Sequence, residues 1–128
     1  MGGILCYSTN KKDDIRKFTV VVRLKKSNEL IGWTGLGPLD FDESEIELYF
    51  GISKDHWNKG YATEASKKIL EFGLNELELE RIITVVKPQN KPSIRIIERI
   101  GMKYFKTLNG LAKKFDFYNG ALYYFKNK

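Results

Sequence analysis

Apolar and polar residues alternate in the first half of the chain, with the two-residue period of β-strands. Phe18–Leu24 is short and rich in valine, and a turn at Ser27-Asn28 joins it to Leu30–Leu36, so the two segments predict a hairpin. Gly37–Ser44 is acidic and predicts a loop. Glu45–Ile52 alternates throughout and predicts a third strand, with one face made of Ile46, Leu48, Phe50 and Ile52 and the other of Glu45, Glu47, Tyr49 and Gly51.

The apolar spacing lengthens to the period of a helix after Tyr61. Tyr61–Leu77 is predicted to be helical because its apolar residues share one face, at Ala62, Ala65, Ile69 and Phe72. Arg81–Val86 is continuously apolar after its first residue, which is typical of a strand buried on both faces. A second helix is predicted from Asn90 as its N-cap to Gly101 just past its end, with Pro92 in the first turn.

The last quarter of the chain predicts two more strands, Met102–Leu108 and Ala121–Lys126, with Asn-Gly turns at Asn109 and Asn119. Phe115, Phe117 and Tyr118 are expected to extend or decorate this hairpin. The predicted order is three strands, helix, strand, helix and two strands. It indicates an α/β (α+β) fold with a mixed, mostly antiparallel central sheet flanked by helices, locally parallel around the first helix. The length of 128 residues predicts a single domain, residues 1–128.

The composition, 42% apolar and 30% charged residues, is typical of a soluble globular domain. No apolar run reaches the roughly 20 residues of a membrane span, and the N-terminus has no basic region of a signal peptide. We therefore expect no membrane partner. Cys6 is the single cysteine, which excludes an internal disulfide and favours a cytoplasmic location and a buried or terminal structural role. No spacing of His, Cys or carboxylate residues predicts a metal site.

The net charge of +6 arises from scattered lysines and arginines without a long basic run. This pattern favours a solvated surface, and nucleic acid is an unlikely class of partner on this basis. A polyphosphate ligand would also benefit from the positive field.

Trp57-Asn58-Lys59-Gly60-Tyr61-Ala62-Thr63-Glu64-Ala65 joins the third predicted strand to the first predicted helix. The first turn of a helix has unpaired backbone N–H groups and a partial positive charge, both of which an anion satisfies. Gly60 would let a ligand approach the backbone closely, and Lys59 adds a positive charge. An ordinary strand-to-helix turn is the other reading of these residues alone. His56, beside this turn, would either touch a phosphate or lie exposed.

The same string resembles the acetyl-CoA pyrophosphate loop of the GNAT N-acetyltransferases, in particular the branch that acetylates ribosomal-protein N-termini. A second stretch is similar to the same family: Asn90, Ser93 three residues on, and then Glu98-Arg99-Ile100-Gly101-Met102. The resemblance covers about residues 30–128 and is clearest there. It implies a GNAT-like acyl-CoA acyltransferase fold, with acetyl-CoA as co-substrate, an amine as acceptor and no metal.

The resemblance implies which residues would bind acetyl-CoA. The turn would hold the pyrophosphate mainly through backbone N–H groups, and the end of the third strand would pair with the pantetheine arm while also contributing to the core. Asn90 would bind the pantetheine or act as an N-cap. The residues implied are Phe50, Gly51, Ile52, Trp57, Asn58, Lys59, Gly60, Tyr61, Ala62, Thr63, Asn90 and Ser93.

Glu47 is the candidate general base, with Glu45 on the same strand face as its substitute. A cross-strand charge pair is the structural alternative for Glu47. Many GNAT enzymes use a tyrosine to protonate the leaving thiolate, but Ile97 occupies that place here. Ser93 would replace it, or cap the helix locally. The acidic stretch Asp40–Glu47 would attract a cationic acceptor or form a solvated hairpin loop.

Family members usually carry a first strand and two helices before the strand that corresponds to Phe18–Leu24. Only Met1–Lys17 precede it here, so we expect the first strand and helices to be largely missing, with a helix remnant at Asp13–Lys17. A homodimer is expected because such a chain leaves sheet edge and apolar surface to cover.

The sequence therefore predicts an acetyl-CoA-dependent N-acetyltransferase acting on a protein N-terminus or a small-molecule amine. The alternatives are a CoA-binding module with little or no turnover, and a nucleic-acid-binding domain suggested only by the charge.

Overall fold

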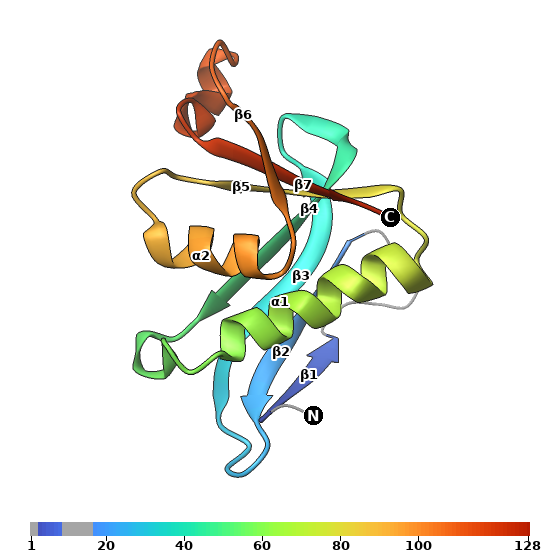
Figure 1. Ribbon diagram of the computed structural model, residues 1–128, viewed down its shortest axis with the longest axis vertical. Helices are drawn as coiled ribbons and strands as arrows, with labels where there is room; N and C mark the ends of the chain where they lie inside the picture. Colours follow the sequence, from blue (N-terminus) through green and yellow to red (C-terminus); the bar gives the residue numbers. More distant parts are fainter. Residues whose placement is uncertain (1–2, 9–16) are drawn as a thin grey trace.

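The computed structural model describes residues 3–8 and 17–128. Within these residues seven strands form one sheet in the order β1-β2-β3-β4-β5-β7-β6, with helices packed on it (Figure 1). The strands are β1 (Ile4–Ser8), β2 (Phe18–Leu24), β3 (Leu30–Leu39), β4 (Asp42–Ile52), β5 (Arg81–Val86), β6 (Lys103–Thr107) and β7 (Leu122–Asn127). The helices are α1 (Tyr61–Glu71) and α2 (Lys91–Arg99), with the short helices η1 (Lys54–His56), η2 (Phe72–Glu76) and η3 (Lys113–Tyr118).

The predicted fold class is confirmed, since β4 and β5 are parallel and every other neighbouring pair is antiparallel. A core of aliphatic side chains joins one face of the sheet to the two helices: Leu36, Leu48 and Ile82 from the sheet pack with Ile69 of α1 and Ile97 of α2. Burial of such side chains contributes about 1.5–3 kcal/mol each. The two helices therefore cover one face of the sheet, and other residues cover the opposite face.

The opposite face of the sheet is covered by the C-terminal segment around η3. There Ile83 of β5 and Tyr123 of β7 form a second cluster with Leu108, and Phe41 and Tyr118 pack against its margin. Of the aromatic residues of η3, Tyr118 packs against this cluster, whereas Phe117 is 74% exposed. They lie in a 3₁₀ helix rather than in an extension of the hairpin.

The N-terminus differs from the sequence-based expectation. The prediction that the first strand is missing is wrong, because β1 pairs antiparallel with β2, with Ile4 opposite Leu24. Ile4 is buried against Val22, Ile31 and Ala65, and this apolar contact holds the strand at the sheet edge. The predicted helix remnant, Asp13–Lys17, lies outside the described residues except for Lys17.

The predicted acidic loop Gly37–Ser44 is also wrong. β3 continues to Leu39 and β4 begins at Asp42, so only Asp40 and Phe41 lie between them. Leu39 is buried, whereas Asp42 and its two successors are exposed. An exposed strand end tolerates polar side chains, and its composition therefore resembles a loop.

The predicted single helix Tyr61–Leu77 ends as an α-helix at Glu71 and continues as the π-helical turn η2. Gly73 lies in this turn, where an added Cβ would stand 2.6 Å from Cδ1 of Ile82 and 2.8 Å from Cδ1 of Leu36. A glycine is needed here because the helix lies against the sheet at that distance.

The sheet separates between β4 and β5. The two strands pair at a single position, Glu47 with Ile83, whereas the other neighbouring pairs extend over several residues. One residue further on, the Thr84 hydroxyl donates to the Leu48 carbonyl oxygen at 2.9 Å. Figure 1 shows the carboxyl ends of β4 and β5 diverging beyond this point. A side chain therefore replaces the next backbone hydrogen bond where the strands part.

We expect Thr84→Val to destabilise the fold by about 1–3 kcal/mol, because it leaves the buried Leu48 carbonyl without its donor while conserving side-chain shape. Urea unfolding measures this difference. Thr107→Val, at an exposed threonine, is the control and should change stability by less than about 0.5 kcal/mol. Equal stabilities for the two variants would show that the Thr84 hydrogen bond is not needed at the separation.

Candidate functional site

The separation leaves one edge of β4 without a partner strand. Successive residues of a strand direct their backbone groups to opposite edges. Tyr49 directs its carbonyl toward β3, where it accepts a hydrogen bond from the Thr34 hydroxyl, and Leu48 directs its carbonyl toward β5. Phe50 therefore faces the side on which β5 has diverged. Its N–H and carbonyl form an edge to which an extended ligand can be added like a strand.

The turn after β4 is anchored to the end of that strand. The Trp57 indole N–H donates to the Ile52 carbonyl at 2.7 Å, although half of the Trp57 surface remains exposed. The Ile52 carbonyl is therefore already hydrogen-bonded. Among the residues predicted to contact pantetheine, Phe50 has its backbone N–H and carbonyl on the open edge of β4. Asn58 and Gly60 have φ values of 62° and 81°, which bend the chain back into α1.

The start of α1 is open above Gly60. No side chain caps the first turn of the helix, and a Cβ added at Gly60 would meet nothing within 4 Å. Lys59 is exposed beside it. Unpaired N–H groups, the positive end of the helix dipole and a lysine in one place suit a phosphate group. The geometry thus fits the predicted anion site on the residues Trp57–Thr63.

His56 is not exposed as one of its two predicted roles required, and its contact with a phosphate stays a prediction. Its Nδ1 lies 2.9 Å from the Ser53 hydroxyl, and its Nε2 lies 3.7 Å from a carboxylate oxygen of Glu29. The imidazole is also half-buried rather than exposed. The hydrogen bond to Ser53 connects the histidine to the residue before η1.

Glu47 lies where β4 and β5 last pair, on the sheet face opposite α1 and α2. It is half-buried. Burial, and to a lesser extent the negative charge of Asp40, raises the pKa of its carboxyl from 4.5 to about 7. A carboxylate with a pKa near neutrality can take a proton from an amine and release it again. This property makes Glu47 a functional candidate rather than only a structural one.

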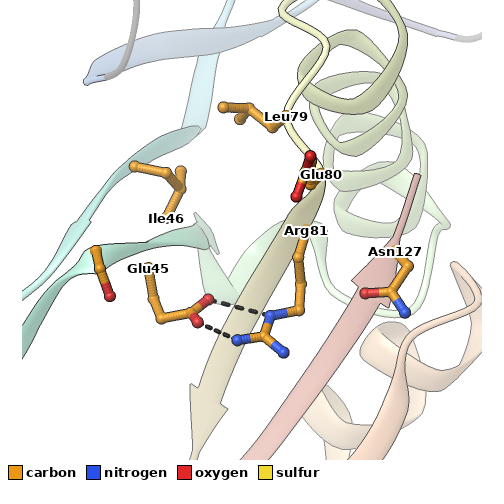
Figure 2. A pocket seen from close by; sticks show the side chains of 7 residues that line it. Glu45, Ile46, Leu79, Glu80, Arg81 and Asn127 are labelled. Carbon is orange, nitrogen blue, oxygen red and sulfur yellow. Dashed lines mark hydrogen bonds and ion pairs between the residues drawn. The ribbon is translucent and has the colours of Figure 1, made fainter.

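Glu45, the predicted substitute base, is bound in a bidentate pair. Both nitrogens of the Arg81 fork, Nε and Nη2, donate to its carboxylate, and Figure 2 shows the two side chains facing each other. Such a pair occupies the oxygens that a base would need. Glu45 therefore joins the starts of β4 and β5, and Glu47 is the carboxylate left near the separation.

Asn90 and Ser93 lie in the first turn of α2, which follows β5 on the other arm of the separation (Figure 1). The Asn90 side-chain oxygen accepts a hydrogen bond from the Ser93 backbone N–H at 3.3 Å, so the predicted N-cap is confirmed. Ser93 is half-buried. Ile97 is 1% exposed within the core, and its position is closed to any ligand.

Two functional features escaped the sequence reasoning. Thr84 was a polar residue inside an apolar run, and that interruption was a usable signal. The second feature is a hydrogen bond from the Tyr118 hydroxyl to Asp40, which joins residues 78 positions apart and has no local signature.

Two surface cavities lie away from this site. One of about 450 Å³ surrounds the Glu45–Arg81 pair (Figure 2). The other, of about 360 Å³, lies between the start of β4 and β6, beside Asp42 and Lys106. Neither is lined by Glu47 or by the turn before α1. The candidate site therefore consists of an open strand edge and an open helix start, outside both cavities.

Among residues 3–8 and 17–128 no group of three or more His, Cys, Asp or Glu side chains could hold a metal ion. No helix in the described part of the chain is long and apolar enough to span a bilayer.

Comparison with known proteins identifies the fold with a family. A family model described as "Acetyltransferase (GNAT) domain" matches residues 5–103. The uncharacterized N-acetyltransferase YnaD of Bacillus subtilis is 39% identical over 73% of this chain and 54% of its own length. The uncharacterized N-acetyltransferase p20 of Bacillus licheniformis is 30% identical over 83% of this chain and 56% of its own length. The chain thus spans little more than half the length of these relatives.

A crystal structure of a GNAT-family acetyltransferase from Bacillus anthracis superposes with a TM-score of 0.68 at 31% identity, covering 85% of this chain and 65% of that one. The acetyltransferase from Agrobacterium tumefaciens has a TM-score of 0.74 at 24% identity, over 89% of this chain and 63% of that one, and shows the same fold.

Glu47 should make the stability of the protein depend on pH. Its raised pKa means that the folded state holds the proton more strongly than the unfolded state, so its contribution to stability falls as the pH rises from 4.5 through about 7. Glu47→Gln cannot ionise and should be more stable than wild type at pH 8, by about 1–3 kcal/mol, and equal to it at pH 4. Urea unfolding at both pH values measures this.

Glu43→Gln, at an exposed glutamate two residues before Glu45 on the same strand, is the matched control and should follow the wild type at both pH values. A constant difference between Glu47→Gln and wild type at pH 4 and 8 would contradict the raised pKa.

Proposed function

The chain belongs to the acetyltransferase (GNAT) domain family, and from this premise we propose that it binds acetyl-CoA and transfers the acetyl group to a primary amine. The observation that carries this proposal is the position of Glu47, a carboxylate with a pKa of about 7 at the point where β4 and β5 part. When bound, acetyl-CoA supplies an activated acetyl thioester. The remaining work is done by side chains and backbone groups of this protein.

The donor would be held at two places on the chain. The open first turn of α1 at Gly60, with Lys59, would bind the pyrophosphate, and the free edge of β4 at Phe50 would hydrogen-bond the pantetheine arm. The same edge offers an N–H to the thioester oxygen, and a donor of this kind is worth about 3 kcal/mol in the transition state. Trp57, Asn58, Tyr61, Ala62 and Thr63 complete the pyrophosphate turn, and Gly51 and Ile52 the strand end.

Glu47 would act as the general base. It accepts a proton from the acceptor ammonium, directly or through a water molecule, and leaves an amine whose lone pair forms the new C–N bond as the C–S bond breaks. As the C–N bond forms, the nitrogen loses a second proton, and the Ser93 hydroxyl in the first turn of α2 would pass this proton to the departing sulfur. A thiol pKa of about 8.5 means that the thiolate needs little help to leave.

The acceptor is a primary amine of a protein N-terminus or of a small molecule. The ribosomal-protein branch is supported by the putative ribosomal N-acetyltransferase YdaF of Bacillus subtilis, which is 33% identical over 72 residues. Asp40 and Glu47 on the acceptor side favour a cationic molecule, since an ammonium is attracted by carboxylates. A homodimer and a cytoplasmic location stay predictions.

A second candidate function is a CoA-binding module with little turnover. Ile97 favours it, because this side chain is buried. It occupies the position at which many GNAT enzymes carry the tyrosine that protonates the thiolate. The two functions share the donor site and differ in whether Glu47 and Ser93 complete the reaction.

Gly60→Glu should abolish acetyl-CoA binding, because it places a carboxylate where the phosphates lie and forces a side chain onto a backbone with φ of 81°. Calorimetry on the wild type should give a Kd on the order of 1 µM, or about 8 kcal/mol. Gly120→Glu is the matched control: its φ is 88°, it too has open space around a Cβ, and it should bind like the wild type. No binding by the wild type would overturn the donor site.

A mass-spectrometric screen of amines with acetyl-CoA should reveal an acetylated acceptor. Glu47→Gln should then lower kcat/KM by about 10²–10⁴-fold, and the wild-type rate should rise with pH through about 7. Glu43→Gln should leave both unchanged. Binding of acetyl-CoA without acetylation of any amine would favour the module without turnover, and full activity in Glu47→Gln would exclude Glu47 as the base.

A further inference from the structure

The C-terminal segment is joined to the β3–β4 turn on the acceptor side of the sheet. The Tyr118 hydroxyl, at the end of η3, donates to Oδ2 of Asp40 at 2.5 Å. Next to this bond the Phe41 ring packs against the rings of Tyr118 and Phe115, with centroids 5.1 and 6.0 Å away. These contacts fix the position of the phenol and with it the carboxylate of Asp40.

A second anchor holds the other side of the same segment. The Lys87 ammonium lies 4.3 Å from the centroid of the Phe117 ring and also donates to the Phe117 carbonyl. Lys87 follows the end of β5, so the segment is attached both to the β3–β4 turn and to the strand that diverges from β4. Tyr118 and Asp40 therefore hold a defined place over the face that carries Glu47.

We propose that Tyr118 and Asp40 form a positioning pair, in which the tyrosine holds the aspartate close enough for its charge to act on Glu47. The proposal rests on the proposed function in one respect, since it concerns the same acceptor end and the same base. It gives the C-terminal segment a role in the reaction, although neither residue touches the acetyl group.

Both Tyr118 and Glu47 have raised pKa values, and Asp40 contributes to each increase. The hydrogen bond to Asp40 raises the pKa of Tyr118 to about 12, so the phenol stays protonated and remains a donor at neutral pH. The charge of Asp40 adds to burial in raising the pKa of Glu47 to about 7, which matches a base that works at neutral pH.

The titratable neighbours of Glu47 on its own strand are engaged in other contacts. On its own strand, Glu45 is bound by Arg81 of β5. The Tyr49 hydroxyl donates to the Phe18 carbonyl.

The neighbouring elements add two more groups. On β7, burial raises the pKa of Tyr123 to about 12, so it carries no charge at neutral pH. From the start of β2, the Lys17 side chain lies 3.4 Å from where a Cβ of Gly37, opposite Glu47, would stand. The upward shift of the Glu47 pKa comes from burial and, to a lesser extent, from the charge of Asp40.

The test is a titration of the Glu47 carboxyl by ¹³C NMR in the full chain without acetyl-CoA. Asp40→Asn should shift the Glu47 titration to lower pH, toward the ordinary glutamate value. Tyr118→Phe keeps the ring on Phe41 but loses the donor, and should shift it in the same direction by a smaller amount. The double variant should match Asp40→Asn alone, because the tyrosine acts through the aspartate.

Asp42→Asn and Tyr104→Phe are matched controls, since Asp42 accepts from Ser44 and Tyr104 contacts Thr107 at exposed positions. Both should titrate like the wild type. A Glu47 titration that is unchanged in a folded Asp40→Asn variant overturns the pair, whatever the activity. If an acceptor is acetylated, the low-pH limb of the kcat/KM profile in Asp40→Asn should shift together with the NMR titration. A limb that stays in place also overturns the proposed pair.

Failure of the proposed function gives a different result. A Glu47 titration that moves in Asp40→Asn, in a wild type that acetylates no amine, supports the pair and overturns the transferase proposal.

Discussion

The separation of β4 from β5 is the constraint on which the rest of this structure depends. Backbone pairing stops after Glu47 and Ile83, and the Thr84 hydroxyl satisfies the next carbonyl, at Leu48. A buried carbonyl without a partner would be costly, so the side chain allows the strands to part without that loss. The parting leaves a free backbone edge on β4, and the chain that continues from this edge turns directly into the open start of α1.

Electrostatics on the acceptor side follow from the same arrangement. Glu45 and Glu47 share one strand face, yet their environments differ: Arg81 binds the first, whereas the second has burial and the charge of Asp40. Arg81 therefore holds the Glu45 carboxylate as part of the scaffold, whereas the Glu47 carboxyl has a pKa of about 7. The functional difference between two glutamates two residues apart arises from partners on β5 and on the β3–β4 turn, not from their own strand.

Particular elements show how far the sequence could predict the structure. The strand at Phe18–Leu24, the N-cap at Asn90 and the two-faced pattern of β4 were predicted because each depends on neighbouring residues. The acidic start of β4 was predicted as a loop, since an exposed strand end has the composition of a loop. β1 was not expected at all, because its pairing with β2 depends on contacts such as that of Ile4 with Val22.

By itself, the sequence determined the order of strands and helices from Phe18 onward, the glycine turn before α1 and the glutamate that is the candidate base, because periodicity, capping and turn chemistry are local. Only the tertiary structure decided which glutamate is free, where the sheet opens and that Tyr118 reaches Asp40. Each of these depends on contacts between side chains that are distant in sequence and come together once the sheet has formed. No local sequence pattern predicts such contacts.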